Sequence, residues 1–163
     1  MKRIIPIFVS ILLFGCIPQS RNFSSKPEMR GTVSDVIDGD TIYVFVKTNT
    51  IKVRLSDIDT PEKKQPYGLE AKDFVIKTAL GKIVIVKYRG KDRYGRIVGT
   101  VIIGTNDVSI NQELLKSGLA YWYRQYSTNQ ALGILEMEAK TNKLGIWSLT
   151  NSIPPWEWRK KHK

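Results

Sequence analysis

The chain has 163 residues, of which 42% are hydrophobic and 25% are charged, and its formal net charge is +11. This composition excludes a wholly disordered chain and a polytopic membrane protein, and the length is that of one domain. The excess of Lys and Arg favours a polyanionic partner, either nucleic acid or an anionic membrane surface. Basic side chains that only keep the protein soluble would give the same charge.

The N-terminus has the pattern of a signal for export. Lys2 and Arg3 precede an almost wholly apolar stretch, which is too short to span a bilayer as a helix. It ends in a Gly followed by Cys16, and this ending is similar to the lipobox of bacterial lipoproteins, in which the Cys is lipidated. We expect a lipoprotein-type signal peptide over 1–16, a lipid anchor at Cys16 and a place in the cell envelope. A plain signal peptide, leading to a periplasmic or secreted protein, is the alternative.

The rest of the chain divides into a tether, a domain and a tail. Residues 17–28 are rich in Pro and Ser and have the composition of a flexible tether. The domain is predicted over 29–149, and it has no Cys, which excludes disulfides and zinc–thiolate sites. Residues 150–163 form a basic tail with two Trp residues. This tail would either fold back through its Trp pair or bind phosphates or lipid headgroups.

Hydrophobic periodicity predicts an α+β fold that is mainly β. Alternating apolar residues indicate strands, a spacing of three and four indicates helices, and Gly, Asp and Asn mark the turns between them. The predicted elements, in chain order, are strands 30–37, 41–47 and 51–55, a helix over 69–80, strands 82–88 and 96–103, and helices 109–116 and 129–142. Five short strands with a helix between the third and the fourth predict a closed OB-fold barrel, with three helices in all.

Two acidic loops flank the second and third predicted strands. Asp38 and Asp40 enclose a Gly before the second strand, and Asp59 and Glu62 follow the third. In a hairpin the start of one strand lies beside the end of the next, so the two loops are expected to meet. Their oxygen atoms suit a hard cation such as Ca²⁺, and the shortage of His and Cys argues against zinc. Each loop alone is better explained as a turn, and it is the meeting of the two loops that favours a site.

Two arginines accompany these loops. Arg54 alternates with apolar neighbours, so its side chain is expected to point away from the core, and Arg96 follows a charged turn over 90–95. A guanidinium group binds phosphate oxygens with two nitrogens and stays charged, so it stabilises charge that develops at phosphorus. The alternative is that each arginine pairs with a nearby Asp and has a structural role.

The order of these residues resembles the staphylococcal (micrococcal) nuclease, or thermonuclease, family. The resemblance rests on residues 38–44, 54–62 and 92–99, and it extends from about Gly31 to Trp147. It implies an OB barrel with three helices that hydrolyses phosphodiester bonds of DNA and RNA with Ca²⁺. A non-catalytic OB-fold module that binds nucleic acid is the alternative function. No protein partner is implied, and we expect a monomer.

The resemblance also implies a metal site. Asp40 and Asp59 would bind Ca²⁺ through their carboxylates, and Thr60 would bind it through its carbonyl oxygen. Asp38 and Thr41 would support these ligands through water.

The remaining roles concern the reaction and the substrate. By the same resemblance, Glu62 would orient or deprotonate the attacking water, and Arg54 and Arg96 would hold the scissile phosphate. Tyr94 would pack against a nucleotide phosphate, and Tyr126 would contact the substrate, because aromatic rings interleaved with Arg124 suit base stacking.

Overall fold

The computed structural model describes residues 27–104 and 108–162, so the predicted signal peptide, Cys16 and most of the tether lie outside the described residues. The strands are β1 (Glu28–Asp38), β2 (Thr41–Val46), β3 (Asn49–Leu55), β4 (Ile58–Asp59), β5 (Ile83–Lys91), β6 (Ile97–Ile103), β7 (Val108–Ser109) and β8 (Tyr121–Trp122). The helices are α1 (Gly68–Ala79), α2 (Ile110–Lys116), α3 (Gln130–Thr141) and α4 (Pro155–Lys161), with short 3-10 turns η1 (Arg124–Tyr126) and η2 (Gly145–Ser148).

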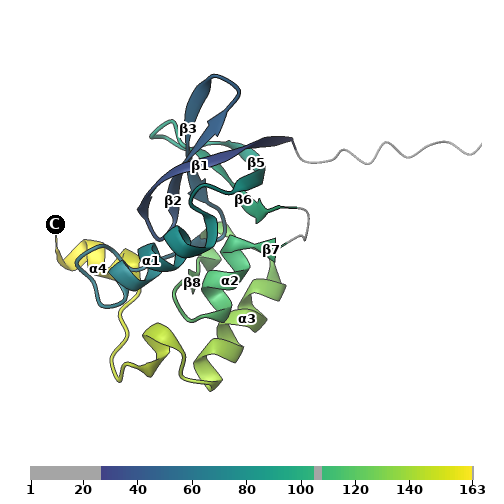
Figure 1. Ribbon diagram of the computed structural model, residues 1–163. Coiled ribbons are helices and arrows are strands. Elements are labelled where there is room, and N and C mark those ends of the chain that lie inside the picture. Colours follow the sequence, from purple (N-terminus) through teal and green to yellow (C-terminus); the bar gives the residue numbers. More distant parts are fainter. Residues whose placement is uncertain (1–26, 105–107, 163) are drawn as a thin grey trace, which may run out of the picture.

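The long strands close into a barrel (Figure 1). The order of strands in the main sheet is β3-β2-β1-β5-β6-β7, and β3 also pairs with β6 in parallel, with Val53 opposite Ile97. This last pairing closes β3, β2, β1, β5 and β6 into a ring, with β7 paired to β6 outside it, so β3 does not present a free edge. The predicted OB-type barrel and its mainly β, α+β class are therefore confirmed.

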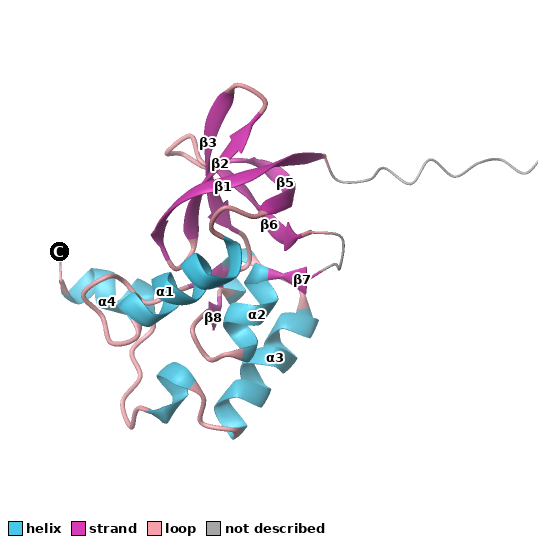
Figure 2. Ribbon diagram, viewed as in Figure 1, coloured by secondary structure: helices cyan, strands magenta, loops and turns pink. Residues whose placement is uncertain are grey.

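Apolar side chains from the strands fill the barrel. Val44, Val53, Val86 and Val101 are all fully buried, and each alternates with more exposed neighbours along its strand. Helix α1 adds the buried residues Ala71, Val75 and Ala79 to one side of the barrel. Helices α2 and α3 lie together below the barrel in the view of Figure 2. This rigid core holds the loops at the ends of β1 and β3, where the acidic residues lie.

The structure differs from the sequence prediction in the tail. We expected three helices, but a fourth, α4, forms within residues 150–163. It has seven residues, with Pro155 at its first position, where the missing N–H costs nothing. A helix this short has no clear periodicity and depends on packing for its stability, which is why the sequence did not predict it. In the described parts of the chain, no helix is long and apolar enough to cross a membrane.

Candidate active site

The two acidic loops meet at one end of the β2–β3 hairpin, as expected. Thr41 lies opposite Arg54 in the register of the two strands. The backbone N–H of Thr60 donates to the Asp40 carboxylate over 3.1 Å, which joins one loop to the other. Gly39 permits this approach, because a Cβ atom there would lie 2.8 Å from the Thr60 hydroxyl oxygen.

Arg54 bridges the two buried carboxylates of this site. Its Nη2 atom lies 2.8 Å from Asp59 Oδ1 and 3.0 Å from Asp40 Oδ2. Asp59 is 1% exposed and Asp40 is 7% exposed, so both charges are largely removed from water. Nη1 of Arg54 donates to the Leu55 and Ile58 carbonyl oxygens, at 2.7 and 3.0 Å, which fixes the direction of the guanidinium group. The arginine is therefore held over both acids by groups of its own strand and the following loop.

The acidic loops hold more negative charge than one arginine balances. Burial, and then the nearby charge of Asp40, raise the pKa of Asp38 to about 6. Burial also raises the pKa of Asp59, although Arg159 and Arg54 oppose this shift. Crowded carboxylates raise one another's pKa because ionising one disfavours ionising the next. A bound cation would relieve this repulsion.

The donor atoms at the loops fit a hard cation. They are the carboxylate oxygens of Asp40 and Asp59 with the carbonyl of the adjacent Thr60, and all are oxygen, as Ca²⁺ prefers. Over residues 27–104 and 108–162, no group of three or more His, Cys, Asp or Glu side chains is arranged to hold a metal ion. Two carboxylates and a carbonyl would leave the remaining positions of a calcium ion to water and substrate.

Glu62 lies beside these carboxylates in the loop before α1. Its backbone N–H donates to Gln65 Oε1 over 3.1 Å, and a Cβ atom at Gly68 would collide with its carbonyl group. The Glu62 side chain is 41% exposed, and one of its oxygens lies 2.6 Å from Nη1 of Arg159. The loop therefore fixes the backbone of Glu62, while its carboxylate reaches toward solvent and is held by an arginine from the far end of the chain.

Arg159, on α4, also binds Asp59. Its Nη2 atom lies 2.8 Å from Asp59 Oδ2, and its Nη1 atom lies 3.4 Å from Oδ1. Burial lowers the pKa of this guanidinium group, but the hydrogen bonds to Asp59 and Glu62 outweigh burial and raise it. Two arginines thus share Asp59, one from β3 and one from α4.

Arg96 and Tyr94 lie apart from this cluster. Among the described residues, the ion pair of Arg96 is with Asp92, at 2.7 Å. Burial would raise the pKa of Asp92, but hydrogen bonds from Arg96 and from the turn outweigh it and lower the pKa. Ile97 pairs with Val53 and both are buried, so Arg96 and Arg54 lie on the same outer face of the barrel. Tyr94 is 67% exposed beside Arg96.

Aromatic residues adjoin the acidic loops through β4 and β8. Asp59 pairs with Tyr121 across these two short strands. Tyr123 follows, and its ring stacks on Trp156 of α4, with centroids 5.1 Å apart. Tyr126 packs edge-on against Tyr123 at 4.7 Å and remains 63% exposed. The predicted substrate tyrosine is therefore the outer member of an aromatic cluster beside the site.

Comparison with known proteins agrees with this geometry. Residues 52–149 match the family model described as staphylococcal nuclease homologue. The chain belongs to the staphylococcal nuclease family. An uncharacterized endonuclease of Escherichia coli is 42% identical over 132 residues, which cover 81% of this chain and 86% of the relative. A micrococcal nuclease of Shigella flexneri is 37% identical and covers 83% of each chain. A staphylococcal-like nuclease of Arabidopsis thaliana is 40% identical over 89% of this chain, but the match spans 45% of that longer protein.

These relationships define the class of reaction. The family match and the relatives named as endonucleases show that the protein is a nuclease, a hydrolase that acts on nucleic acid as an endonuclease. Of the residues predicted for its site, the structure brings together Asp40, Asp59, Arg54 and Glu62. It places Arg96 with Asp92, and Tyr126 next to the site through the aromatic cluster.

The sequence prediction missed two residues that contact the candidate site. Arg159 contacts both Asp59 and Glu62, although 100 and 97 residues separate them along the chain. Gln65 holds the Glu62 backbone and also donates to the carbonyl of Ile153 over 2.5 Å. No local pattern marks either residue; the only sequence signal was the Trp pair of the tail, which suggested that the tail folds back.

Proposed function

We propose that this nuclease hydrolyses phosphodiester bonds of both DNA and RNA in a Ca²⁺-dependent reaction. One observation above all supports the proposal. Two nearly buried carboxylates, Asp40 and Asp59, converge on the same nitrogen of Arg54, beside the carboxylate of Glu62. Burying this many charges costs folding free energy, and the barrel could fold without them. A site that cleaves a phosphodiester needs such charges to bind and stabilise the reacting phosphate.

Asp40, Asp59 and the carbonyl oxygen of Thr60 would hold the calcium ion. When bound, Ca²⁺ supplies positive charge that polarises a phosphoryl oxygen. Burial raises the pKa of Asp59 despite the opposing effects of Arg159 and Arg54, and a bound cation would favour its charged form, which supports this proposal. The Thr41 hydroxyl donates to the Asp40 carboxylate and Asp38 accepts from the Asp40 backbone N–H, each over 3.1 Å, so Thr41 would orient the carboxylate and Asp38 the backbone that carries it.

The protein's own groups would perform the reaction. Glu62 would orient the attacking water and accept its proton, since its carboxylate is accessible beside the two acids. Arg54 would donate to a phosphate oxygen where negative charge develops, because its guanidinium group is already fixed at the site. Arg96 would bind the substrate from the same outer face, and it would then exchange its contact with Asp92 for one with phosphate.

The proposal covers both DNA and RNA because the contacts available are insensitive to the sugar. Tyr94 and Tyr126 present exposed rings, and stacking on an aromatic ring is open to every base. The excess of basic residues attracts the phosphate backbone, which both polymers share. A single strand, with its bases free to stack, would fit these rings better than a duplex.

A binding module without catalysis is the competing function. It would account for the basic surface and the exposed aromatic rings. It would not need the paired carboxylates with Arg54 and Glu62 beside them, so we favour the nuclease with an intact catalytic set.

The proposed cell-envelope location is a separate matter. The basic and apolar N-terminus supports export, and the single Cys16 directly after the apolar stretch supports a lipid anchor. Labelling cells with radioactive palmitate should mark the wild-type protein and leave Cys16→Ser unlabelled. Label on both variants, or on neither, would reject the anchor and leave a periplasmic or secreted monomer as the expectation.

The test of the proposed activity uses the purified protein, supercoiled plasmid and a single-stranded RNA. Both substrates should be cut in Ca²⁺, and neither should be cut when a chelator replaces it. Glu62→Ala should lower the rate on both by about 10²-fold or more, while the circular dichroism spectrum stays unchanged. Binding of both substrates without cleavage in Ca²⁺ would instead establish the module.

A further inference from the structure

We propose that Arg159 is a positioning residue of this nuclease, which holds the Glu62 carboxylate in place so that it can act on the attacking water. The inference rests on the proposed role of Glu62. It makes the C-terminal helix α4 a working part of the active site. The observation behind it is the guanidinium group of Arg159, which reaches Glu62 at 2.6 Å and Asp59 at 2.8 Å.

Helix α4 packs on the β8 segment through an aromatic contact. Trp156 lies parallel to Tyr123, with an interplanar angle of 1°, and packs edge-on against Tyr121 at 5.7 Å. Residues three apart lie on the same face of a helix, so Trp156 and Arg159 point to the same side of α4. The ring therefore fixes the helix on the β8 segment, and this places the guanidinium group over Asp59, which pairs with Tyr121.

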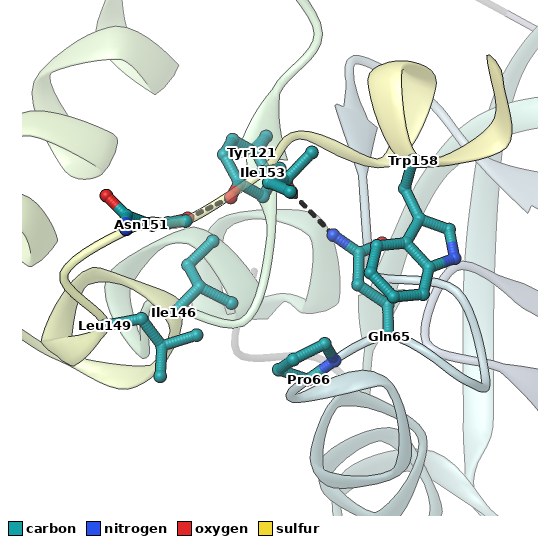
Figure 3. A pocket seen from close by; sticks show the side chains of 9 residues that line it. Gln65, Pro66, Tyr121, Ile146, Leu149, Asn151, Ile153 and Trp158 are labelled. Carbon is teal, nitrogen blue, oxygen red and sulfur yellow. Dashed lines mark hydrogen bonds between the residues drawn. The ribbon is translucent and has the colours of Figure 1, made fainter. Parts of the chain in front are cut away.

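The segment that leads into α4 is tied to the loop of Glu62. Figure 3 shows the Gln65 amide pointing to the carbonyl of Ile153, to which it donates over 2.5 Å. The Tyr121 hydroxyl group is hydrogen-bonded to Ser152. The pocket between these residues holds about 50 Å³, far below the several hundred Å³ of a typical ligand site, so it is a gap in the packing. Gln65 thus connects the Glu62 backbone to the chain that carries Arg159.

The contacts of Glu62 show what Arg159 contributes. Within the described residues, Arg159 is the one polar partner of the Glu62 carboxylate, and it binds a single oxygen, Oε1. The second oxygen has no partner there, and Glu62 lines an open groove together with Lys63, Lys64, Trp158, Arg159 and His162. A side chain that is 41% exposed would otherwise sample several rotamers. Arg159 restricts it and leaves one oxygen available to water.

The same geometry distinguishes positioning from two other roles. Nη1 of Arg159 binds Glu62 and Nη2 binds Asp59, so Arg159 would have to release one of these carboxylates before it could bind a phosphate in the groove. A helix that blocks the site would cover Glu62, but its carboxylate stays open on one side. A misplaced catalytic group loses much of its effect, so loss of Arg159 should act on the chemical step rather than on binding.

The test compares Arg159→Ala, Arg159→Lys and the matched control Lys160→Ala in the complete protein. Lys160 is the exposed neighbour on α4, so its removal takes the same charge from the same helix. Arg159→Ala should lower kcat by about 10-fold or more with little change in KM, since Glu62 would be less well placed. Arg159→Lys should recover part of the loss, because it keeps one donor, and Lys160→Ala should match the wild type.

A double variant shows whether Arg159 acts through Glu62. In a Glu62→Ala background there is no carboxylate to position, so adding Arg159→Ala should change kcat by less than about twofold. Ca²⁺ binding, measured by calorimetry without nucleic acid, should be no weaker in Arg159→Ala, because the substitution removes a positive charge beside Asp59. Together these results would separate positioning of Glu62 from support of the metal site.

Several outcomes would overturn the proposal. A rise in kcat for Arg159→Ala would make α4 an inhibitory helix, and a rise in KM alone would make Arg159 a substrate ligand. The proposal would also be wrong if Arg159→Ala lowered kcat equally in the wild-type and Glu62→Ala backgrounds, or if it weakened Ca²⁺ binding. If the wild type cuts no substrate in Ca²⁺, the proposed function is wrong. If the wild type cuts and Arg159→Ala cuts equally well, only the proposed role of Arg159 is wrong.

Discussion

Arg54 and Arg159 bind the same carboxylate, Asp59, but the protein holds the two arginines in different ways. Arg54 belongs to a barrel strand, its side chain is 14% exposed, and it contacts two buried acids. Arg159 belongs to a seven-residue helix at the end of the chain, and its side chain is 41% exposed. Arg54 is therefore part of the folded barrel, while Arg159 is joined to it by a separate packing contact. Substitutions of the two arginines should therefore have different effects on stability and activity.

The largest effect is expected from Arg54→Ala. The substitution removes the group that would stabilise charge on the phosphate, so kcat should fall by about 10²–10³-fold. It also leaves the buried Asp40 without its ion-pair partner and the buried Asp59 with Arg159 alone, which should lower the free energy of unfolding by about 3 kcal/mol in the absence of Ca²⁺. Cleavage kinetics and urea unfolding measure the two effects. A stable but inactive variant would show that Arg54 is not needed to balance the acids.

Calcium should sharpen the comparison by replacing the charge that Arg54 supplies. An ion that binds only the folded state at 100 times its Kd stabilises by about 2.7 kcal/mol. The unfolding temperature of the wild type should rise with Ca²⁺, and that of Arg54→Ala should rise at least as much. Mg²⁺ at equal concentration is the control, because it requires a tighter octahedral arrangement. No rise in either protein would contradict calcium binding at these carboxylates.

A smaller effect is expected from Trp156→Ala, which alters the packing contact of α4. Trp156→Ala removes the ring that stacks on Tyr123, so α4 should dock less firmly and kcat should fall by about fivefold. The barrel should remain folded, because its closure depends on β3 and β6 rather than on the tail. Near-ultraviolet circular dichroism reports the loss of the stacked pair, and far-ultraviolet spectra report the barrel. A global loss of structure would mean that the tail is part of the folding core.

The smallest effect is expected from Lys161→Ala. This exposed side chain of α4 contributes only charge near the groove, so KM should rise by less than about twofold at physiological salt. Steady-state kinetics at low and high salt measure it. If Lys161→Ala lowered kcat/KM as much as Trp156→Ala does, the charge of α4 would matter more for cleavage than its docking.

The sequence predicts the barrel part of the site for physical reasons. Alternating residues define the hairpin of β2 and β3, and hairpin geometry alone brings Asp40 beside the loop of Asp59. The outward direction of Arg54 follows from the buried Val53 and Leu55 on either side of it. Each of these inferences uses contacts between neighbours in the chain or in one hairpin.

The remaining parts of the site were beyond the sequence because they depend on distant packing. The contact of Arg159 with Asp59 joins residues 100 apart in the chain and requires α4 to pack beside the barrel, and a seven-residue helix has no clear periodicity from which to predict it. Arg96 was expected beside the phosphate, and it lies on the same outer face as Arg54, but its ion pair is with Asp92. Which partner a long side chain selects depends on the local arrangement of charges, and spacing does not determine it.

We propose that the paired carboxylates of Asp40 and Asp59 bind the calcium ion on which catalysis depends. Plasmid cleavage by the wild type and by Asp59→Asn, each titrated with Ca²⁺ from a chelated start, tests it most directly. We predict that the cleavage rate of the wild type rises with Ca²⁺ from background to a plateau. The rate of Asp59→Asn, which keeps the shape of the side chain but loses its charge, should stay at least about 10²-fold lower at every Ca²⁺ concentration. Cleavage by the wild type in the chelator, or the same calcium dependence in both proteins, would contradict the account.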